Sequence, residues 1–292
     1  MGIKGFIKEK AADIVYSLYR NGVLKMKHPV RVMSVDETID ELLNTEKSLV
    51  RFGDGEIVMM RGRALKFQKE DEALASRLRE IIRYKDDGLM VSVQDIFGDL
   101  SMYIPASRRF WKDHLLAYRK YYDMWLDPDR VYASTSFSRC YATIQDRSQS
   151  PGWFEKIKRI WKDRRVVVVE GERSFTGVGN DLLSEALEVR RIIGPASQAY
   201  AAYDRILEAC RRMPKDRLML LAIGPSAKPL AEDLFHDGYR VIDIGHLNME
   251  YNWFLAGVED KGHIDPELKQ RMDAARQEAM SGYTDEIAER IV

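Results

Sequence analysis

Two carboxylates stand close together in the stretch Arg51-Phe-Gly53-Asp54-Gly55-Glu56. In an extended chain, residues two apart point to the same side with their Cα atoms about 7 Å apart, so Asp54 and Glu56 would share one face. The glycines beside them let a ligand approach the backbone. Paired carboxylates suit Mg²⁺ or Mn²⁺, which also bind substrate phosphates. The stretch therefore predicts a divalent-cation site, although Asp-Gly is also a common signal for a type I′ turn.

The glycine-rich stretch Glu170–Asp181 follows the valine run 166–169, and a helix is expected from about residue 181. Backbone N–H groups at such a helix start can face an anion, and the helix dipole favours negative charge there. Arg173 could add a guanidinium fork for a phosphate. The stretch contains neither GxGxxG nor GxxxxGK[ST], so dinucleotide and P-loop sites lack their fingerprints. The alternative is an ordinary loop with an Asn or Asp cap.

Two further polar residues follow expected strands. His246 comes just after the run 239–244 and could ligate a metal or bind a phosphate, although a lone histidine is more often structural. Asp95 lies just past the run 88–93 and could bind a sugar hydroxyl or act as a base.

The hydrophobic pattern predicts the elements that must position these residues. Helical spacing and a capping signal at Ser34 predict an early helix, and short apolar runs alternate with helical segments thereafter. Such alternation is typical of an α/β protein with a Rossmann-like, open, mostly parallel sheet, which binds ligands at the carboxyl ends of its strands. The expected strands are 49–52, 88–93, 131–134, 166–169, 191–193, 218–223 and 239–244. The expected helices are 70–84, 105–126, one from about 181, 197–212 and 227–237.

The composition excludes several classes of protein. The 292 residues include 46 Lys or Arg and 46 Asp or Glu, so no net positive charge is available for nucleic acid. A hydrophobic content of 45% indicates a globular chain. Cys140 and Cys210 have neither disulfide-framework nor zinc-site spacing. Because we find no signal peptide and no apolar run long enough to span a membrane, we expect a cytoplasmic protein.

The two ends of the chain differ in charge, and we expect three regions. Residues 1–30 form a basic arm with an amphipathic helix over 3–19, 31–258 form a single α/β domain, and 259–292 form a helical, polar, acidic tail. Residues 1–20 could make peripheral contact with the inner face of an anionic membrane. The alternative is packing on the protein's own domain or on a partner subunit of a homo-oligomer.

Five blocks of residues, in matching order over about 45–258, resemble the bacterial GT-D-type glycosyltransferase domain, long known only as a domain of unknown function. The blocks are Arg51–Glu56; Phe67-Gln68 with Asp71, Leu74, Arg77 and Leu78; Glu170–Arg173 with Gly177-Val178-Gly179-Asn180-Asp181; Ile223-Gly-Pro225; and Asp243–His246 with Glu250-Tyr-x-Trp-Phe254. Gly-Asp-Gly-Glu alone is a weak signal, whereas five ordered blocks are fairly specific.

The resemblance implies a metal-dependent transfer of a sugar, glucose or a related hexose, from a UDP-sugar to a hydroxyl of a glycan, glycoprotein or lipid-linked acceptor. It implies that Asp54 and Glu56 engage Mn²⁺ or Mg²⁺ and the donor diphosphate. It leaves the base open among Asp95, His246 and Glu250. The donor-site residues that it implies are Arg51, Gly53, Glu170, Arg173, Gly177, Val178, Gly179, Asn180, Asp181 and His246.

Two other functions stay open on the sequence. The same glycine-rich loops would suit a nucleotide-binding or sensing module without turnover. The paired carboxylates would also suit a metal-dependent phosphohydrolase.

Overall fold

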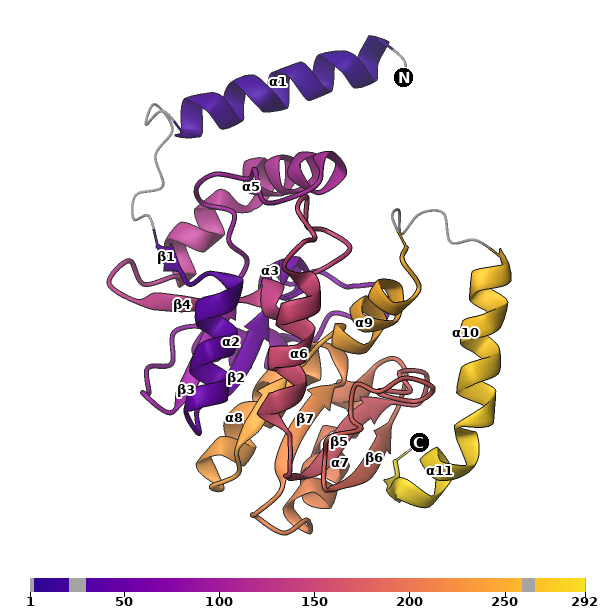
Figure 1. The fold of residues 1–292 in the computed structure, drawn as a ribbon. Coiled ribbons are helices and arrows are strands. Elements are labelled where there is room, and N and C mark those ends of the chain that lie inside the picture. The colour runs from indigo at the N-terminus through magenta and orange to yellow at the C-terminus, as the bar shows by residue number, and fades with distance from the viewer. Residues whose placement is uncertain (1–2, 21–29, 259–265, 292) are drawn as a thin grey trace.

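The computed structural model contains one sheet of nine strands within its described residues, 3–20, 30–258 and 266–291 (Figure 1). The strand order is β1-β4-β3-β2-β8-β7-β5-β6-β9, and neighbouring strands are parallel throughout. The predicted open parallel sheet is therefore confirmed. Parts of the expected arm and tail lie outside the described residues, namely 1–2, 21–29, 259–265 and 292.

Seven strands correspond to the apolar runs of the sequence, and two further strands were not predicted. Those two, at the sheet edges, are short and polar, and one comes from the C-terminal tail. The strands are β1 (Arg31–Val32), β2 (Ser48–Phe52), β3 (Leu89–Val93), β4 (Val131–Ser134), β5 (Arg165–Gly171), β6 (Glu188–Gly194), β7 (Leu218–Ala222), β8 (Val241–Asp243) and β9 (Ile287–Arg290).

Helices cover both faces of the sheet (Figure 1). One apolar core lies between the sheet and α4, α5, α7 and α8, and the other between the sheet and α2, α6 and α9. The helices are α1 (Ile3–Arg20), α2 (Val35–Asn44), α3 (Asp54–Met60), α4 (Glu72–Ile81), α5 (Pro105–Trp125), α6 (Ser150–Ile160), α7 (Tyr203–Arg211), α8 (Ala227–His236), α9 (Leu247–Leu255), α10 (Pro266–Glu278) and α11 (Met280–Glu286). Short 3₁₀ turns are η1 (Thr135–Ser138), η2 (Ala199–Ala202) and η3 (Gly224–Ser226).

The valine run of β5 shows why this strand is apolar throughout. Val167 and Val169 join the core beneath α7 and α8, whereas Val166 and Val168 join the opposite core. Successive side chains of a strand point to opposite faces, so a strand covered on both sides needs apolar residues at every position.

Two local expectations were wrong. Asp54 and Glu56 do not lie in an extended segment or a hairpin turn, because they form the first turn of α3. No helix begins near Asp181, because residues 181–187 form turns and bends. Backbone groups there bond to the α6–β5 connection instead. Trp161 Nε1 donates to the Leu182 carbonyl at 2.8 Å, and Leu187 N donates to the Arg164 carbonyl at 2.9 Å.

The N-terminal helix packs on the helix α5 (Figure 1). Tyr16 Oη donates a 2.6 Å hydrogen bond to the Gly98 carbonyl, and Lys112 of α5 pairs with Asp13. Ile7, Ile14 and Leu18 of α1 stay exposed. Within the described residues, we find no helix with the length and apolar character needed to cross a bilayer.

The predicted capping box at Ser34 is present, and it allows a test of this fold. Glu37 N donates to Ser34 Oγ at 3.1 Å, and Ser34 N donates to Glu37 Oε2 at 2.7 Å. Ser34→Ala removes a partner of a helix N–H group, so the free energy of unfolding should fall by about 1 kcal/mol. Urea titration should show a lower midpoint with an unchanged slope. Ser281→Ala, at an exposed position, is the matched control; an equal effect of both changes would refute the assignment.

Candidate functional site

A cavity of about 560 Å³ opens at the carboxyl ends of the central strands. We call it the first cavity. Six of the predicted site residues line it, and they come from three of the five blocks that carried the resemblance. They are Arg51, Gly53, Asp54, Glu56, Arg173 and His246.

The turn from β2 into α3 positions the two predicted metal ligands differently. Gly53 is the N-cap of α3, and its backbone N–H donates to Glu56 Oε2 at 2.8 Å. Glu56 is therefore held inside the protein as the capping residue of its own helix. The Asp54 side chain is exposed, lines the first cavity, and makes no hydrogen bond or ion pair that we find among the described residues.

A buried ammonium group connects two carboxylates at the floor of the first cavity. Lys228 Nζ of α8 lies 2.7 Å from Glu56 Oε1 and 3.1 Å from Asp243 Oδ2 of β8. Although burial opposes ionisation, Asp243 and Glu56 raise the pKa of Lys228. Burial also opposes ionisation of Glu56, but Lys228, Arg51 and the Gly53 N–H hold the pKa of Glu56 below its usual value. Burial raises the pKa of Asp243 in spite of the same cations.

Arg51 adds a second buried cation to this floor. Its backbone N–H donates to Asp243 Oδ2 at 3.3 Å, and its Nε donates to the Thr135 carbonyl at 3.4 Å. The guanidinium passes directly over Gly245, where a Cβ would lie 3.1 Å from Nη1. Gly245 also has a φ of +50°, which favours glycine. The Gly-His sequence after β8 therefore makes room for Arg51.

Arg139 and His246 form a polar pair at the wall of the first cavity. Arg139 Nη2 lies 3.2 Å from His246 Nδ1. A guanidinium has no acceptor, so Nδ1 must accept this bond, which places the proton of the neutral ring on Nε2. The imidazole stays accessible from the cavity, yet desolvation by the surrounding protein, followed by the charges of Arg139 and Arg51, lowers its pKa to about 3. His246 is therefore a neutral hydrogen-bond donor rather than a strong base.

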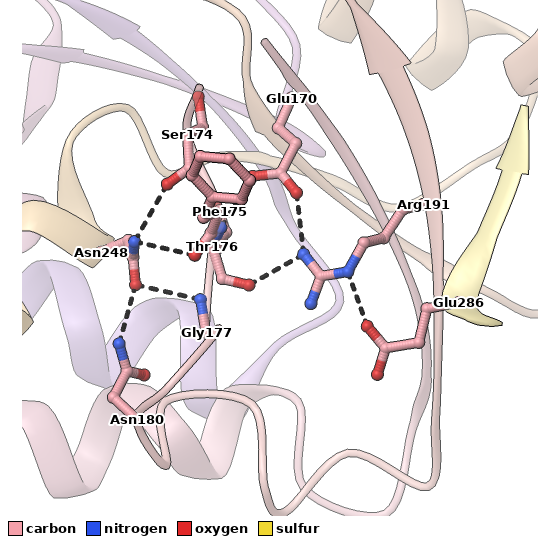
Figure 2. Close-up of polar contacts among 9 residues, drawn as sticks. All are labelled: Glu170, Ser174, Phe175, Thr176, Gly177, Asn180, Arg191, Asn248 and Glu286. Atoms are coloured by element: carbon pink, nitrogen blue, oxygen red, sulfur yellow. Dashed lines mark hydrogen bonds and ion pairs between the residues drawn. The ribbon is translucent and has the colours of Figure 1, made fainter. Parts of the chain in front are cut away.

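The first half of the glycine-rich stretch is tied down by a buried ion pair (Figure 2). Arg191 Nη1 of β6 lies 2.8 Å from Glu170 Oε1 and also donates to the Thr176 carbonyl at 2.8 Å. Glu170 Oε2 accepts from the Thr176 N–H at 2.8 Å, and Glu286 of α11 pairs with Arg191 Nε at 2.6 Å. Glu170 thus holds the loop in place and does not line the cavity.

Asparagines hold the second half of this loop against α9. Asn248 Oδ1 accepts from the Gly177 N–H and from Asn180 Nδ2, both at 3.0 Å (Figure 2). Asn180 Nδ2 also donates to Asn252 Oδ1 at 2.7 Å. Asp181 pairs with Lys158 at 3.0 Å and accepts from Tyr251 Oη at 2.5 Å. Gly177, Asn180 and Asp181 therefore lie outside the lining of the first cavity, and the expected helix start for a phosphate is absent from this stretch.

Gly179 contacts the C-terminal helix α10, whereas Val178 packs in an apolar cluster with Ile193 and Tyr283. A Cβ on Gly179 would lie 2.7 Å from the backbone N of Arg276, and its φ is +77°. The glycine therefore permits close contact between the loop and α10. Arg173, at the start of the same loop, is exposed, and we find no ion pair for it among the described residues.

The two carboxylates expected as bases lie apart from the first cavity's lining. Glu250 is fully buried, and its Oε2 accepts from the backbone N–H groups of Tyr141 at 3.3 Å and Ala142 at 2.8 Å. It positions the segment that carries Arg139. Asp95 is half-buried beyond β3, and burial raises its pKa to about 6.

Sequence reasoning missed Lys228, Asp243 and Arg139. Lys228 follows the Gly-Pro-Ser turn after β7, and its position in the sequence does not indicate that its side chain is buried. Asp243 lies in one of the five blocks that carry the resemblance, but the sequence assigns it no role. Only its place at the end of β8, beside β2, gives it one. For Arg139 we find no signal in the spacing, because it meets His246 across 107 residues.

The carboxylates of the first cavity fit a divalent cation only if a substrate supplies further ligands. Glu56 is occupied by Lys228 and the Gly53 N–H, which leaves Asp54 as the carboxylate open to the cavity. Among the described residues, we find no cluster of three metal-ligating side chains. Mg²⁺ is commonly bound through one or two carboxylates plus substrate phosphates, so Asp54 and a diphosphate fit that pattern.

Comparisons with known proteins identify the family and the fold. A family model described as the glycosyltransferase GT-D fold matches residues 49–272. The chain is 40% identical over 235 residues to a probable glycosyl transferase Gly of Streptococcus gordonii, covering 80% of this chain and 34% of that protein. It is 38% identical over 251 residues to the glycosyltransferase GlyD of Streptococcus pneumoniae serotype 4, covering 86% of this chain and 31% of that protein. The chain spans about a third of the length of these curated relatives.

Solved structures match the fold closely. A domain of unknown function 1792, described as having a distinct glycosyltransferase fold, superposes with a TM-score of 0.83 at 34% identity, covering 90% of this chain and 96% of that one. A glycosyltransferase of the same domain type from Streptococcus sanguinis gives a TM-score of 0.81 at 35% identity, covering 90% of this chain and 100% of that one.

The fold is that of a glycosyltransferase. The chain belongs to the GT-D glycosyltransferase family, as the sequence resemblance predicted.

The ion cluster on the cavity floor allows a direct test. Lys228→Met leaves the buried carboxylates of Glu56 and Asp243 without their ammonium, so the free energy of unfolding should fall by about 3–5 kcal/mol. Urea titration measures the change. Lys162→Met, which removes an exposed lysine, should cost under about 0.5 kcal/mol. Equal, small effects would show that the cluster contributes little.

Asp95 gives a prediction with a defined pH dependence. Its pKa of about 6 lies above the unfolded value of about 3.9, so ionising it disfavours the folded state as pH rises through 6. Asp95→Asn should therefore raise the free energy of unfolding at pH 7.5 by about 2 kcal/mol and have little effect at pH 4. Urea titrations at both pH values provide the measurement. A loss of stability at pH 7.5 would contradict the assigned direction.

Proposed function

We propose that the protein transfers a sugar, glucose or a related hexose, from a UDP-sugar to a hydroxyl group of a glycan, glycoprotein or lipid-linked acceptor, with the help of Mn²⁺ or Mg²⁺. The observation that carries the proposal is the first cavity itself. One open carboxylate, Asp54, shares it with the cations Arg139 and Arg173 and the neutral donor His246. This combination matches a diphosphate accompanied by a divalent cation.

The cations of the cavity divide into two kinds. Lys228 pairs with both carboxylates of the floor. The guanidinium of Arg51 donates to the Thr135 carbonyl and acts on Glu56 and Asp243 through its charge. Arg173 lies exposed at the wall, and Arg139 has a buried Nε for which we find no hydrogen-bond partner in the described residues. These two guanidinium groups, together with His246 Nε2–H, are available to the diphosphate oxygens.

An aromatic residue supports a nucleotide in the same cavity. Phe67 lines it, is 44% exposed, and stands beside Gly224, where a Cβ would lie 3.5 Å from its ring. An exposed ring of this kind offers a flat surface for the uracil base, whose stacking on aromatic side chains is worth about 1–3 kcal/mol.

The proposed reaction breaks one bond and forms another. The acceptor hydroxyl oxygen forms a bond to C1 of the donor sugar, the bond from C1 to the diphosphate oxygen breaks, and UDP leaves with the electron pair. Arg139, Arg173 and His246 stabilise the negative charge that grows on the leaving diphosphate. When bound by Asp54 and the diphosphate, the cation would neutralise part of the same charge. The hydroxyl proton passes to a base or to solvent.

Removing the open carboxylate should abolish the metal-dependent rate. Asp54→Asn should lower UDP release from UDP-glucose on the order of 100-fold, because the cation loses its protein ligand. Excess EDTA should lower the wild-type rate similarly and leave the variant's residual rate unchanged. Asp204→Asn, at an exposed position of α7, is the control.

Other outcomes of this assay contradict the proposal in distinct ways. Full activity in EDTA or in Asp54→Asn would refute the metal role. Binding of UDP without turnover of any nucleotide sugar would favour a sensing module. Release of inorganic phosphate from a phosphorylated metabolite would favour a phosphohydrolase.

The low pKa of His246 predicts how its removal affects the pH profile. His246→Ala should reduce the rate by about 10- to 100-fold, the worth of a hydrogen bond to a charged group. The ring is neutral throughout pH 5–8, so wild type and variant should show the same inflections in kcat against pH. Loss of a wild-type inflection near pH 6.5 would show instead that His246 titrates during catalysis.

A further inference from the structure

A second cavity of about 680 Å³ adjoins the first. The loop after β5, α9 and α10 form its walls. It shares part of its lining with the first cavity, including Arg173, Gly245 and His246. A group bound in the second cavity therefore lies next to the part of the first cavity where the proposed diphosphate binds.

The charges of α10 are sorted by face. The helix carries three bases and three acids, so its formal charge is zero. All three bases, Lys269, Arg271 and Arg276, line the second cavity, whereas Glu267 and Glu278 do not. The lining acid, Asp273, pairs with Arg276 at 2.5 Å. For Lys269 and Arg271 we find no ion pair within the described part of the chain, and Arg173 adds a cation from the opposite wall.

An apolar surface accompanies this positive charge. Trp253 of α9 is partly exposed in the lining, next to Met249 and Leu255 of the same helix and facing Leu268 and Met272 of α10. An indole ring packs well against the C–H face of a sugar, since both are flat and apolar on that side while their edges are polar. The second cavity thus combines a surface for a sugar ring with cations for an anionic group.

We propose that the second cavity is the acceptor site, and that it takes an acceptor glycan bearing an anionic group, a phosphate or a carboxylate. The sugar ring packs on Trp253, and the anion lies against Lys269 and Arg271. This inference rests on the proposed function, because an acceptor needs a donor in the adjoining first cavity. The shared residues Arg173 and His246 mark the boundary at which the acceptor hydroxyl would meet the donor sugar.

The test uses glucose 1-phosphate as the anionic probe and methyl glucoside as its neutral counterpart. Each is titrated into the full chain, with and without saturating UDP and Mg²⁺, while the Trp253 indole ¹⁵N–¹H resonance is followed by NMR. Comparison with Trp253→Phe assigns this resonance. We expect glucose 1-phosphate to shift it with UDP present and to bind at least tenfold more tightly than methyl glucoside.

The variants test the two parts of the site separately. Lys269→Gln/Arg271→Gln should weaken glucose 1-phosphate binding about tenfold or more and leave the weak binding of methyl glucoside unchanged, with an unaltered urea midpoint showing that the fold is retained. Arg205→Gln, which removes an exposed arginine of α7 outside both cavities, should change neither affinity.

Several results would overturn the inference. They are equal affinity for the charged and neutral probes, no effect of the double substitution, or displacement of the probe by UDP. Binding of inorganic phosphate as tight as that of glucose 1-phosphate would show an anion site without a sugar subsite. Failure of UDP to bind refutes the proposed donor site alone, because the probe titration without UDP still reports on the second cavity.

Discussion

The site depends on one buried ammonium. Lys228, held between Glu56 and Asp243, connects the start of α3, the end of β8 and the first turn of α8 at the floor of the first cavity. Taking three charged groups out of water is costly unless each is paired, so these elements must come together in one arrangement. That arrangement leaves Asp54, two positions before Glu56, open to the cavity. The two carboxylates of one motif thus have different surroundings: Glu56 is paired within the floor, and Asp54 is open to the cavity.

The glycine-rich loop after β5 is also held by polar contacts within the protein. Its sequence suggests direct phosphate binding, but most of its polar groups bind other parts of the protein, through the Glu170–Arg191 pair and the asparagines of α9. The loop is therefore held in place by contacts within the protein, and its residues line both cavities. Arg173 of this loop lines both cavities, and Gly179 contacts α10. Rigid placement of the groups around a reaction centre is what electrostatic stabilisation of a leaving group requires.

Local patterns predicted the strands and most helices because each apolar run or helical stripe reports burial within its own segment. The parallel sheet and the position of the ligand site at its strand ends followed from their alternation. Two kinds of feature could not be predicted from the sequence. The sequence predicts that Asp54 and Glu56 continue the preceding strand, whereas the Glu56 cap and Lys228 stabilise a helical turn there. Long-range partners such as Arg139 with His246, and the role of Lys228, depend on contacts between distant segments that we could not infer from spacing alone.

The central claim is that Asp54, together with a donor diphosphate, holds a divalent cation in the first cavity. The most direct measurement is a crystal structure with UDP and Mn²⁺, in which anomalous scattering locates the metal. Our account predicts a manganese peak in direct contact with an Asp54 carboxylate oxygen, with the diphosphate between the metal and Arg173. A manganese peak away from Asp54, or UDP bound outside the first cavity, would contradict the account.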